Sequence, residues 1–302
     1  MLSRRSVRIK VMQTLYAFRT LPDSSFKDVE KHYLLSINKT FSLYLYCLLY
    51  MKNTLQYFKI DSEKKENRKL KSEKDDVSLK FYETPEAQSF VNSDTIDQLC
   101  KEYDVNTEID IDLIRNFYKE FIKSVAYLKF EGGSGTAEEA VSHLFKLLIK
   151  NDVSSEMITD RYPNWFDDES IVKGAVKKTL RAIPLESDFH KAYLPEKEKT
   201  LDLGVNLLYR TWSNNEELEG LIHPRLNNWD PKRVARIDMI LLKMCTSEFL
   251  NFETIPVSAS INEYIEISKL YSTPKSKEFI NGVLDGVVEA LKIENKINSK
   301  KL

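Results

Sequence analysis

Turn-forming residues are scarce in this sequence: only 8 glycines and 9 prolines occur among its 302 residues. A fold built from many short strands needs frequent tight turns, for which glycine and proline are the usual residues. Leucine, lysine and glutamate, which favour helices, are by contrast common throughout the chain. The composition therefore predicts an all-α protein with long helices.

Residues that carry out catalysis or bind metals are also few. The three cysteines, Cys47, Cys100 and Cys245, are odd in number and far apart, which suits buried thiols in a reducing compartment better than disulfides or a metal site. The glycine-rich run at 131–136 lacks the lysine of a phosphate-binding loop. No histidine has a neighbour at metal-site or catalytic-triad spacing; the four are His32, His143, His190 and His223. We therefore expect no cofactor, no metal and no enzymatic activity.

Neither a strong charge nor a long apolar run is present. The formal net charge is -1, so a nucleic-acid surface has to be a local patch rather than the whole molecule. The most apolar stretch, Phe41–Met51, is about half as long as a membrane-spanning helix. The start of the chain is amphipathic and has no apolar core of a signal peptide. We expect a cytoplasmic protein with no membrane partner.

Apolar periodicity predicts where the helices lie. A first helix at 3–20 carries the stripe Val7, Val11, Leu15, and a second covers 26–59. The mixed-charge segment 61–76 has two open interpretations, a solvated helical extension or a disordered tether. Helical patterning resumes at 94–129, and after the glycine-rich run further helices are expected at 137–150, 153–161, 168–182, 196–213 and 215–227.

Three last helices carry start signals. Asp230 is predicted to cap a helix that begins at Pro231, and Ser260–Glu263 matches a capping box that opens the next helix. Thr273 and Pro274 start the final helix, whose apolar residues Phe279, Ile280, Val283, Leu284 and Val287 are expected to be buried. These elements divide the chain into a basic N-terminal helix at 1–19, a helical region with an insertion at 20–200, a C-terminal helical module at 201–293 and a basic tail at 294–302.

The first helix begins with a cluster of cations. Arg4, Arg5, Arg8 and Lys10 precede the first acidic residue, Asp23. Such a cluster alone is weak evidence for binding. Arginine, however, is well suited to phosphates and base edges, because its planar fork donates two hydrogen bonds and stacks on bases. A helix otherwise committed to packing would hold these arginines in position, and single-stranded RNA could then be bound by charge and stacking.

Both ends of the chain carry motifs in a fixed order. The N-terminal run Arg4–Tyr16 resembles the opening of the NusB transcription antitermination family. The C-terminal motifs follow that family's order and spacing over about 201–291; they are Trp229–Asp238, Glu248–Leu250, Ile255–Val257, Ile261–Glu263 and Phe279–Asp285. The likeness is weak or absent across roughly 20–200, where this chain is much longer than the compact bacterial form.

The resemblance implies an all-helical fold of two small bundles that share the N-terminal helix, with an inserted helical region. Family members have no catalytic activity. They bind the boxA segment of nascent RNA together with the ribosomal protein NusE, as part of the RNA polymerase antitermination complex that supports rRNA synthesis. By motif position, RNA-binding residues would be Arg4, Arg5, Arg8, Lys275 and Phe279, and residues that meet NusE would be Tyr16 and Asp238.

The residues themselves leave two of these roles open. Asp238 lies beside the apolar stripe of its helix, where its carboxylate could pair with a nearby arginine or receive a partner's cation. Phe279 continues an i, i+4 apolar series with Val283 and Val287, which favours core packing over base stacking.

Two other functions compete with RNA-binding antitermination. The aromatic-rich middle of the chain is compatible with a protein-binding scaffold that has lost RNA contact. An rRNA cytosine methyltransferase can carry a NusB-like domain, but it needs a nucleotide-binding α/β domain and a catalytic cysteine. The chain ends about ten residues after its last expected helix, so we expect no such domain.

Overall fold

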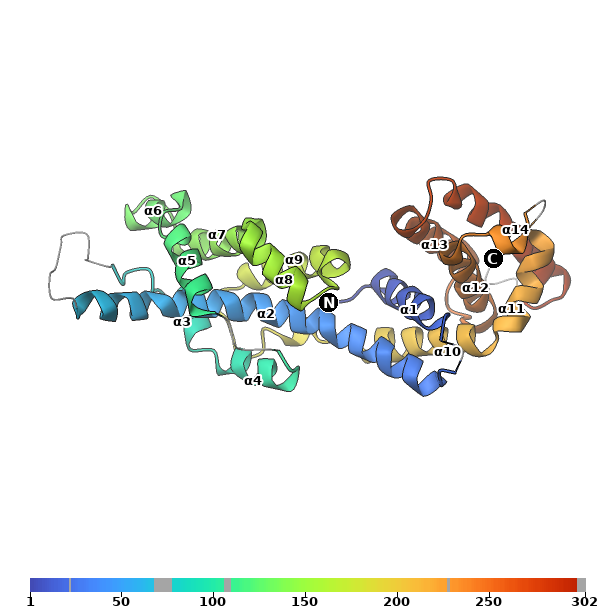
Figure 1. Ribbon diagram of the computed structural model, residues 1–302, viewed down its shortest axis with the longest axis horizontal. Helices are drawn as coiled ribbons and strands as arrows, with labels where there is room; N and C mark the ends of the chain where they lie inside the picture. Colours follow the sequence, from blue (N-terminus) through green and yellow to red (C-terminus); the bar gives the residue numbers. More distant parts are fainter. Residues whose placement is uncertain (22, 68–77, 106–109, 227–228, 298–302) are drawn as a thin grey trace. The chain divides into compact units, whose positions relative to one another are not determined.

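The structure, a computed structural model, describes all residues except 22, 68–77, 106–109, 227–228 and 298–302 (Figure 1). Within these ranges the regular structure is helical, which confirms the expected all-α class. The α-helices are α1 Arg4–Phe18, α2 Phe26–Glu66, α3 Pro85–Val91, α4 Asp94–Glu102, α5 Ile111–Phe121, α6 Val125–Glu131, α7 Ala137–Lys150, α8 Asp152–Arg161, α9 Trp165–Leu180, α10 Asn206–Ser213, α11 Asn215–Ile222, α12 Arg236–Asn251, α13 Val257–Tyr271 and α14 Ser276–Ile293. A π-helix, Glu198–Val205, precedes α10, and short 3₁₀ turns occur at Lys191–Tyr193, His223–Arg225 and Pro231–Arg233.

The chain forms two compact units. Unit 1 consists of Asn38–Leu194 together with Met1, and unit 2 consists of Leu2–Ile37 and Pro195–Leu302. Unit 2 thus takes its residues from both ends of the chain, whereas nearly all of unit 1 comes from the segment between them. Helix α2 contributes its first residues to unit 2 and the rest to unit 1.

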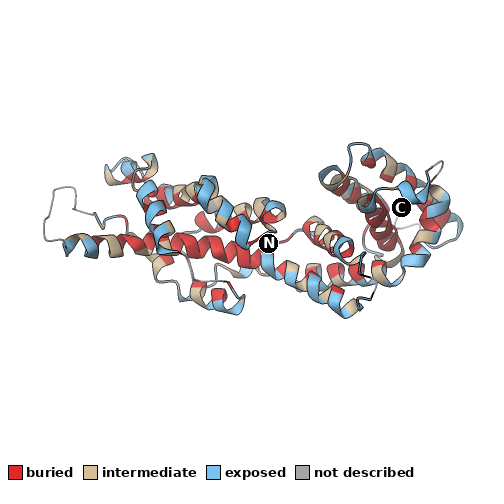
Figure 2. Cartoon of the chain, in the orientation of Figure 1, coloured by how far each residue is buried: buried red, intermediate tan, exposed pale blue. Residues whose placement is uncertain are grey.

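Unit 1 is built around the apolar part of α2. Every residue from 40 to 52 is buried, which appears as the continuous red band along this helix in Figure 2. A helix that is apolar all round has to be enclosed by other helices, and α3 to α9 belong to the same unit. Aromatic rings fill one part of this core; Phe58 contacts Phe81, Tyr118, Phe121 and Tyr127. The apolar stretch of the sequence is therefore the centre of a helical core. The described residues include no helix long and apolar enough to cross a membrane.

Unit 2 is built around α12. All twelve residues from Asp238 to Phe249 are buried, and α12 contacts α1, α10, α11, α13 and α14. Helix α1 also contacts the π-helix, α10 and α13. Val7, Val11 and Leu15 are buried, as their spacing predicts. The first helix is thus held by contacts with several other elements, which keeps its N-terminal turn in place.

Gly204 allows the start of α2 to pack closely on the π-helix. The Tyr33 hydroxyl donates a hydrogen bond to the Thr200 carbonyl oxygen at 3.1 Å. A Cβ atom on Gly204 would lie 1.8 Å from that hydroxyl oxygen and 3.0 Å from a methyl of Val7. Because no side chain fits there, glycine is required at this contact of three segments.

Two of the expected helix starts are wrong. Asp230 does cap a turn, since its side chain accepts from the Lys232 amide, but that turn is the 3₁₀ segment Pro231–Arg233, and α12 begins only at Arg236. Helix α13 begins at Val257, so Ser260 lies inside it rather than at its cap. The last helix begins at Ser276, near the expected start, and Phe279 is only half-buried whereas its four apolar neighbours are buried.

Other expectations can be compared directly. Helix α7 has the expected bounds. All three cysteines are free and buried, as predicted. Of the mixed-charge segment, residues 61–66 belong to α2, and 68–77 lie outside the described residues, as do the last five residues of the tail at 294–302.

Candidate functional site

The start of α1 concentrates positive charge. Ser3 caps the helix by accepting a hydrogen bond from the Ser6 amide, and no acidic residue lies in the first turn. The N-terminus of a helix carries a partial positive charge, so arginines there are disfavoured unless anions compensate them. Acidic side chains from distant segments do so, with a different partner for each of Arg4, Arg5 and Arg8.

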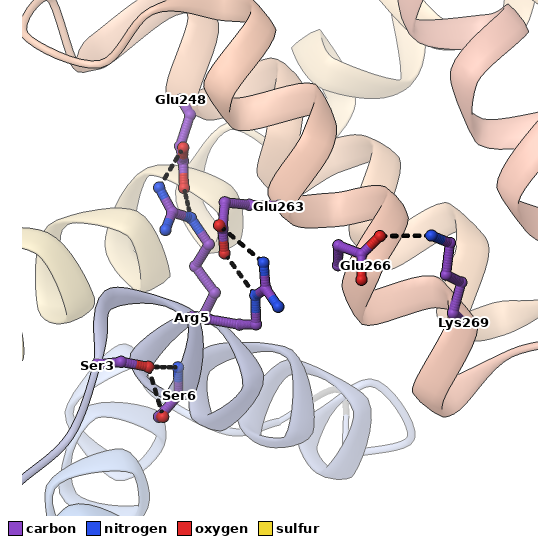
Figure 3. A network of polar contacts seen from close by, with 8 residues as sticks. Ser3, Arg5, Ser6, Glu248, Glu263, Glu266 and Lys269 are labelled. Atoms are coloured by element: carbon purple, nitrogen blue, oxygen red, sulfur yellow. Dashed lines mark hydrogen bonds and ion pairs between the residues drawn. The ribbon is translucent and has the colours of Figure 1, made fainter.

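The outer two arginines remain accessible to solvent. Arg4 pairs with Glu198 of the π-helix at 3.3 Å, and both side chains are more than half exposed. Arg5 donates from Nε and Nη2 to the carboxylate of Glu263 on α13, at 2.8 and 3.0 Å (Figure 3). This hydrogen-bonded pair raises the pKa of Arg5 and lowers that of Glu263. Even so, 41% of the Arg5 side chain is exposed.

Arg8 is buried inside unit 2. Its guanidinium donates to both carboxylate oxygens of Glu248 on α12, at 2.6 and 2.9 Å, and the two side chains are 3% and 0% exposed. Glu248 also accepts from the Ser260 hydroxyl at 2.8 Å and the Tyr264 hydroxyl at 2.7 Å. Burial by itself lowers the pKa of Arg8, but the hydrogen bonds to Glu248 and neighbouring charges outweigh it, and the pKa is raised.

The expected direct contact of Arg8 with RNA does not fit this geometry. Its guanidinium already donates two hydrogen bonds to Glu248, and its side chain is almost fully buried. Arg8 instead ties α1 to α12 and, through Glu248, to α13. The three arginines of the motif thus differ in their exposure and in their partners.

A hollow lies beside the start of α1. Its volume is about 500 Å³, and α1 and the segment leading into α13 line it together: Ser3, Arg4, Arg5, Arg8, Thr254, Ile255, Pro256, Ala259 and Glu263. The polar wall is cationic on the α1 side, while the opposite wall is mostly apolar. The lining also includes the carboxylate of Glu263, so an anionic group in this hollow would share Arg5 with Glu263.

Lys275 and Phe279 lie one turn apart at the start of α14, where the Phe279 amide donates to the Lys275 carbonyl oxygen. Lys275 is exposed and Phe279 is half-buried. The ring of Phe279 contacts that of Trp229, with centroids 5.3 Å apart and planes tilted by 59°. Sequence reasoning assigned no role to Trp229, although it is a surface residue with an exposure of 57%.

Asp238 is not a surface residue. It is 4% exposed, and its carboxylate accepts hydrogen bonds from the Ser272 hydroxyl at 2.5 Å and the Ser276 hydroxyl at 2.7 Å. The expected contact with a partner's cation is therefore not what its position provides. Asp238 holds the turn between α13 and α14, and thus the segment that carries Lys275. Tyr16, in contrast, is 47% exposed and is open to a partner.

A second hollow, which sequence reasoning missed, opens beside the last turn of α1. Its volume is about 290 Å³, and its lining residues are Leu15, Phe18, Arg19, Leu21, Thr211, Trp212, Asn215, Glu219, Ile240 and Lys243. Lys243 donates to Glu219 and Asn215 across its wall. The Thr211 hydroxyl is buried without a hydrogen-bond partner among the described residues. The apolar and aromatic residues at the end of α1, among them Leu15 and Phe18, were a sequence signal for it.

The described residues contain no cluster of three or more histidine, cysteine, aspartate or glutamate side chains that could hold a metal ion.

Comparison with known proteins identifies related sequences. A model described as the NusB family matches residues 167–289. The chain is 40% identical over 105 residues to the transcription antitermination protein NusB of Salinibacter ruber, a match that covers 35% of this chain and 66% of that protein. It is 31% identical over 159 residues to NusB of Clostridium kluyveri, with 53% of this chain and 96% of that protein covered. The match to NusB of Clostridium perfringens is 31% over 150 residues and covers 50% and 94% of the two chains.

Proposed function

Because this chain belongs to the NusB family, we propose that it is a non-catalytic transcription antitermination factor. Its RNA ligand is a boxA-type single strand, which it binds together with NusE within the RNA polymerase antitermination complex during rRNA synthesis. The observation that carries this proposal is the pair of solvent-accessible arginines, Arg4 and Arg5, at the positive end of α1 and on the wall of a hollow.

Unit 2 is the part of the chain that we assign to the family's bundle. It contains both matched motif regions, the basic start of α1 and the segment from Trp229 to Asp285. Most of unit 1 is then an insertion that begins within α2, and the family match, which starts at residue 167, takes in α9 at its end. Its own buried core is consistent with a domain that does not depend on the RNA site.

RNA phosphates replace carboxylates in this site. An exposed ion pair such as Arg4–Glu198 contributes about 0–1 kcal/mol, so a phosphate exchanges for Glu198 at little free-energy cost. Arg5 stays accessible while it is paired with Glu263, because 41% of its side chain is exposed. Arg8 acts indirectly. Its buried pair with Glu248 fixes the orientation of α1, which presents Arg4 and Arg5 to the RNA.

NusE binds at the surface that includes Tyr16. The phenol is nearly half exposed on a helix whose opposite face is buried, so a partner can cover it without rearranging the bundle. Asp238 is buried and does not contact NusE directly. It contributes to the RNA surface, because it holds the turn that presents Lys275 and Phe279.

Charge reversal tests the RNA site. Affinity for a labelled boxA RNA, measured by fluorescence anisotropy with the full chain, is expected to fall as salt rises and to increase when NusE is added. Arg4→Glu and Arg5→Glu should each weaken binding and reduce the salt dependence. Lys292→Glu, an exposed change in the last turn of α14, serves as the control and should bind like the wild type.

Two results would contradict the proposal. One is equal affinity for boxA RNA and a scrambled sequence in the presence of NusE. The other is unchanged affinity after both arginines are reversed, which would favour a protein-binding scaffold that has lost RNA contact.

A further inference from the structure

Two aromatic rings form a surface pair on unit 2. Trp229 is 57% exposed, and its indole lies against the half-buried ring of Phe279, with a centroid separation of 5.3 Å and an interplanar angle of 59°. The two residues are fifty positions apart in sequence. A single exposed aromatic residue on a surface is ordinary. Evidence for a function has to come from the contacts that hold the two rings and from the charged residues near them.

Both rings are held by the backbone on which they sit. The Trp229 amide donates to the Leu226 carbonyl oxygen at 2.8 Å, and the 3₁₀ turn capped by Asp230 follows at once. Phe279 lies in the first turn of α14, which Ser276 anchors to the buried Asp238. Because these hydrogen bonds hold the backbone at both rings, an incoming planar group finds the pair already formed and loses less conformational entropy on binding.

The elements that carry the rings are rich in cations. Between 229 and 236 the exposed cations are Lys232, Arg233 and Arg236, and the single acid, Asp230, accepts a hydrogen bond from the Lys232 amide. Lys275 is exposed one turn before Phe279. Glu278, the acid nearest to Phe279 in sequence, pairs with Lys277. Exposed rings next to cations are the combination that binds a single-stranded nucleic acid, through stacking and phosphate contacts together.

We propose that Trp229 and Phe279 form a stacking platform for a base of the bound RNA, with Trp229 as the outer ring. This inference rests on the proposed function and extends its RNA surface to a residue outside the positions assigned from the family motif. Phe279 supports the indole from one side, which leaves the other parts of the ring to the base. Stacking of this kind tolerates any base, so Trp229 contributes affinity rather than sequence preference.

The test combines affinity with tryptophan fluorescence in the full chain. The probe is a single-stranded RNA that contains boxA, with a scrambled strand of the same length beside it. Trp229→Ala is expected to weaken binding of both strands about tenfold to a hundredfold, the effect of losing one stacked base. Trp229→Phe retains a ring and should stay within about threefold of the wild type.

Fluorescence identifies which tryptophan meets RNA. Titration with RNA should quench the emission of the wild type, and this quenching should disappear in Trp229→Phe. Trp212→Phe is the matched control, because Trp212 is only half-exposed and lies on α10; this variant should keep the quenching. Quenching that is lost only with Trp229 therefore supports direct stacking independently of affinity.

Four outcomes overturn the platform. If the wild type binds RNA while Trp229→Ala binds it equally well, or if quenching persists in Trp229→Phe, the platform fails and the proposed function stands. If Trp229→Ala loses affinity for NusE but not for RNA, the pair is a protein-binding surface. If the wild type binds neither the boxA strand nor the scrambled strand when NusE is present, both the proposed function and the platform fail.

Discussion

Replacing Glu248 with glutamine removes the carboxylate that accepts both hydrogen bonds from the buried guanidinium of Arg8. The two side chains are 3% and 0% exposed, so water cannot take over the lost interaction. Breaking a buried ion pair by removing one partner destabilises a protein by about 3–5 kcal/mol. Since domains have a free energy of unfolding of about 5–15 kcal/mol, we expect Glu248→Gln to weaken unit 2 severely.

A double-mutant cycle separates the pair from its surroundings. Arg8→Met removes the cation and keeps most of the volume, whereas Glu248 retains its hydrogen bonds from Ser260 and Tyr264. In the double variant Arg8→Met/Glu248→Gln neither member of the pair is charged, and the glutamine oxygen can still accept from a hydroxyl. We therefore expect the double variant to be more stable than the sum of the single changes by about 2 kcal/mol or more.

Hydrogen exchange of the α12 amides is the suitable assay. The chain consists of two compact units, which need not unfold together, so a global melting curve can mix two transitions. Exchange reports the opening free energy of the segment that contains Glu248. Two results would refute a strong Arg8–Glu248 interaction. One is a single variant that changes the opening free energy by less than about 1 kcal/mol. The other is a double variant whose change equals the sum of the two single changes.

The same variants decide what Arg8 does for RNA. If Arg8 only positions α1, the double variant regains RNA affinity as it regains stability. If Arg8 touches RNA, the double variant stays defective although it is folded.

Three further predictions concern the same unit. Gly204→Ala should destabilise unit 2 by about 1–3 kcal/mol in hydrogen exchange, because its Cβ would meet the Tyr33 hydroxyl oxygen at 1.8 Å; the control Gly220→Ala, which has nothing within 4 Å of its Cβ, should be neutral or stabilising by up to about 1 kcal/mol. Asp238→Ala should lower stability by about 1.5–3 kcal/mol, because two hydroxyls lose a charged acceptor, and the loss should appear in urea unfolding without any partner added. The lowered pKa of Glu263 means that its pair with Arg5 stabilises the fold above the ordinary value of 4.5 and is lost as the pH falls through the lower folded pKa; the stability difference between wild type and Glu263→Gln, at most about 1 kcal/mol at pH 6, should vanish on acidification, and a constant difference would contradict this.

Local signals predicted helices well and their starts less well. Helix α7 begins at a true capping box, Thr136 with Glu139, and its bounds follow from apolar spacing alone. Ser260 and Glu263 have the same spacing as a capping box, but they lie within α13. Their side chains bind Glu248 and Arg5 instead. A four-residue pattern cannot reveal partners that come from elsewhere in the chain. The sequence pattern alone therefore could not show that α13 begins at Val257 rather than after Ser260.

The candidate site shows the same limit. Arg4, Arg5 and Lys275 lie on the surface as expected, because long cations leave the core unless a carboxylate accompanies them. Asp238 and Phe279 each had two open interpretations. Asp238 is buried on two serine hydroxyls, which neither interpretation included, and Phe279 is half-buried against Trp229.

The sequence alone determined the helical class, the buried cysteines and the family, because composition, residue spacing and motif order are properties of the chain itself. It also predicted an RNA-binding role for the basic start of the first helix. Only the tertiary structure decided which arginine faces solvent. Arg8 is buried because Glu248, 240 residues away in sequence, is brought against it with two hydroxyls. A charge enters the interior only where the fold supplies a counter-charge and hydrogen bonds, and that pairing exists only once the chain has folded.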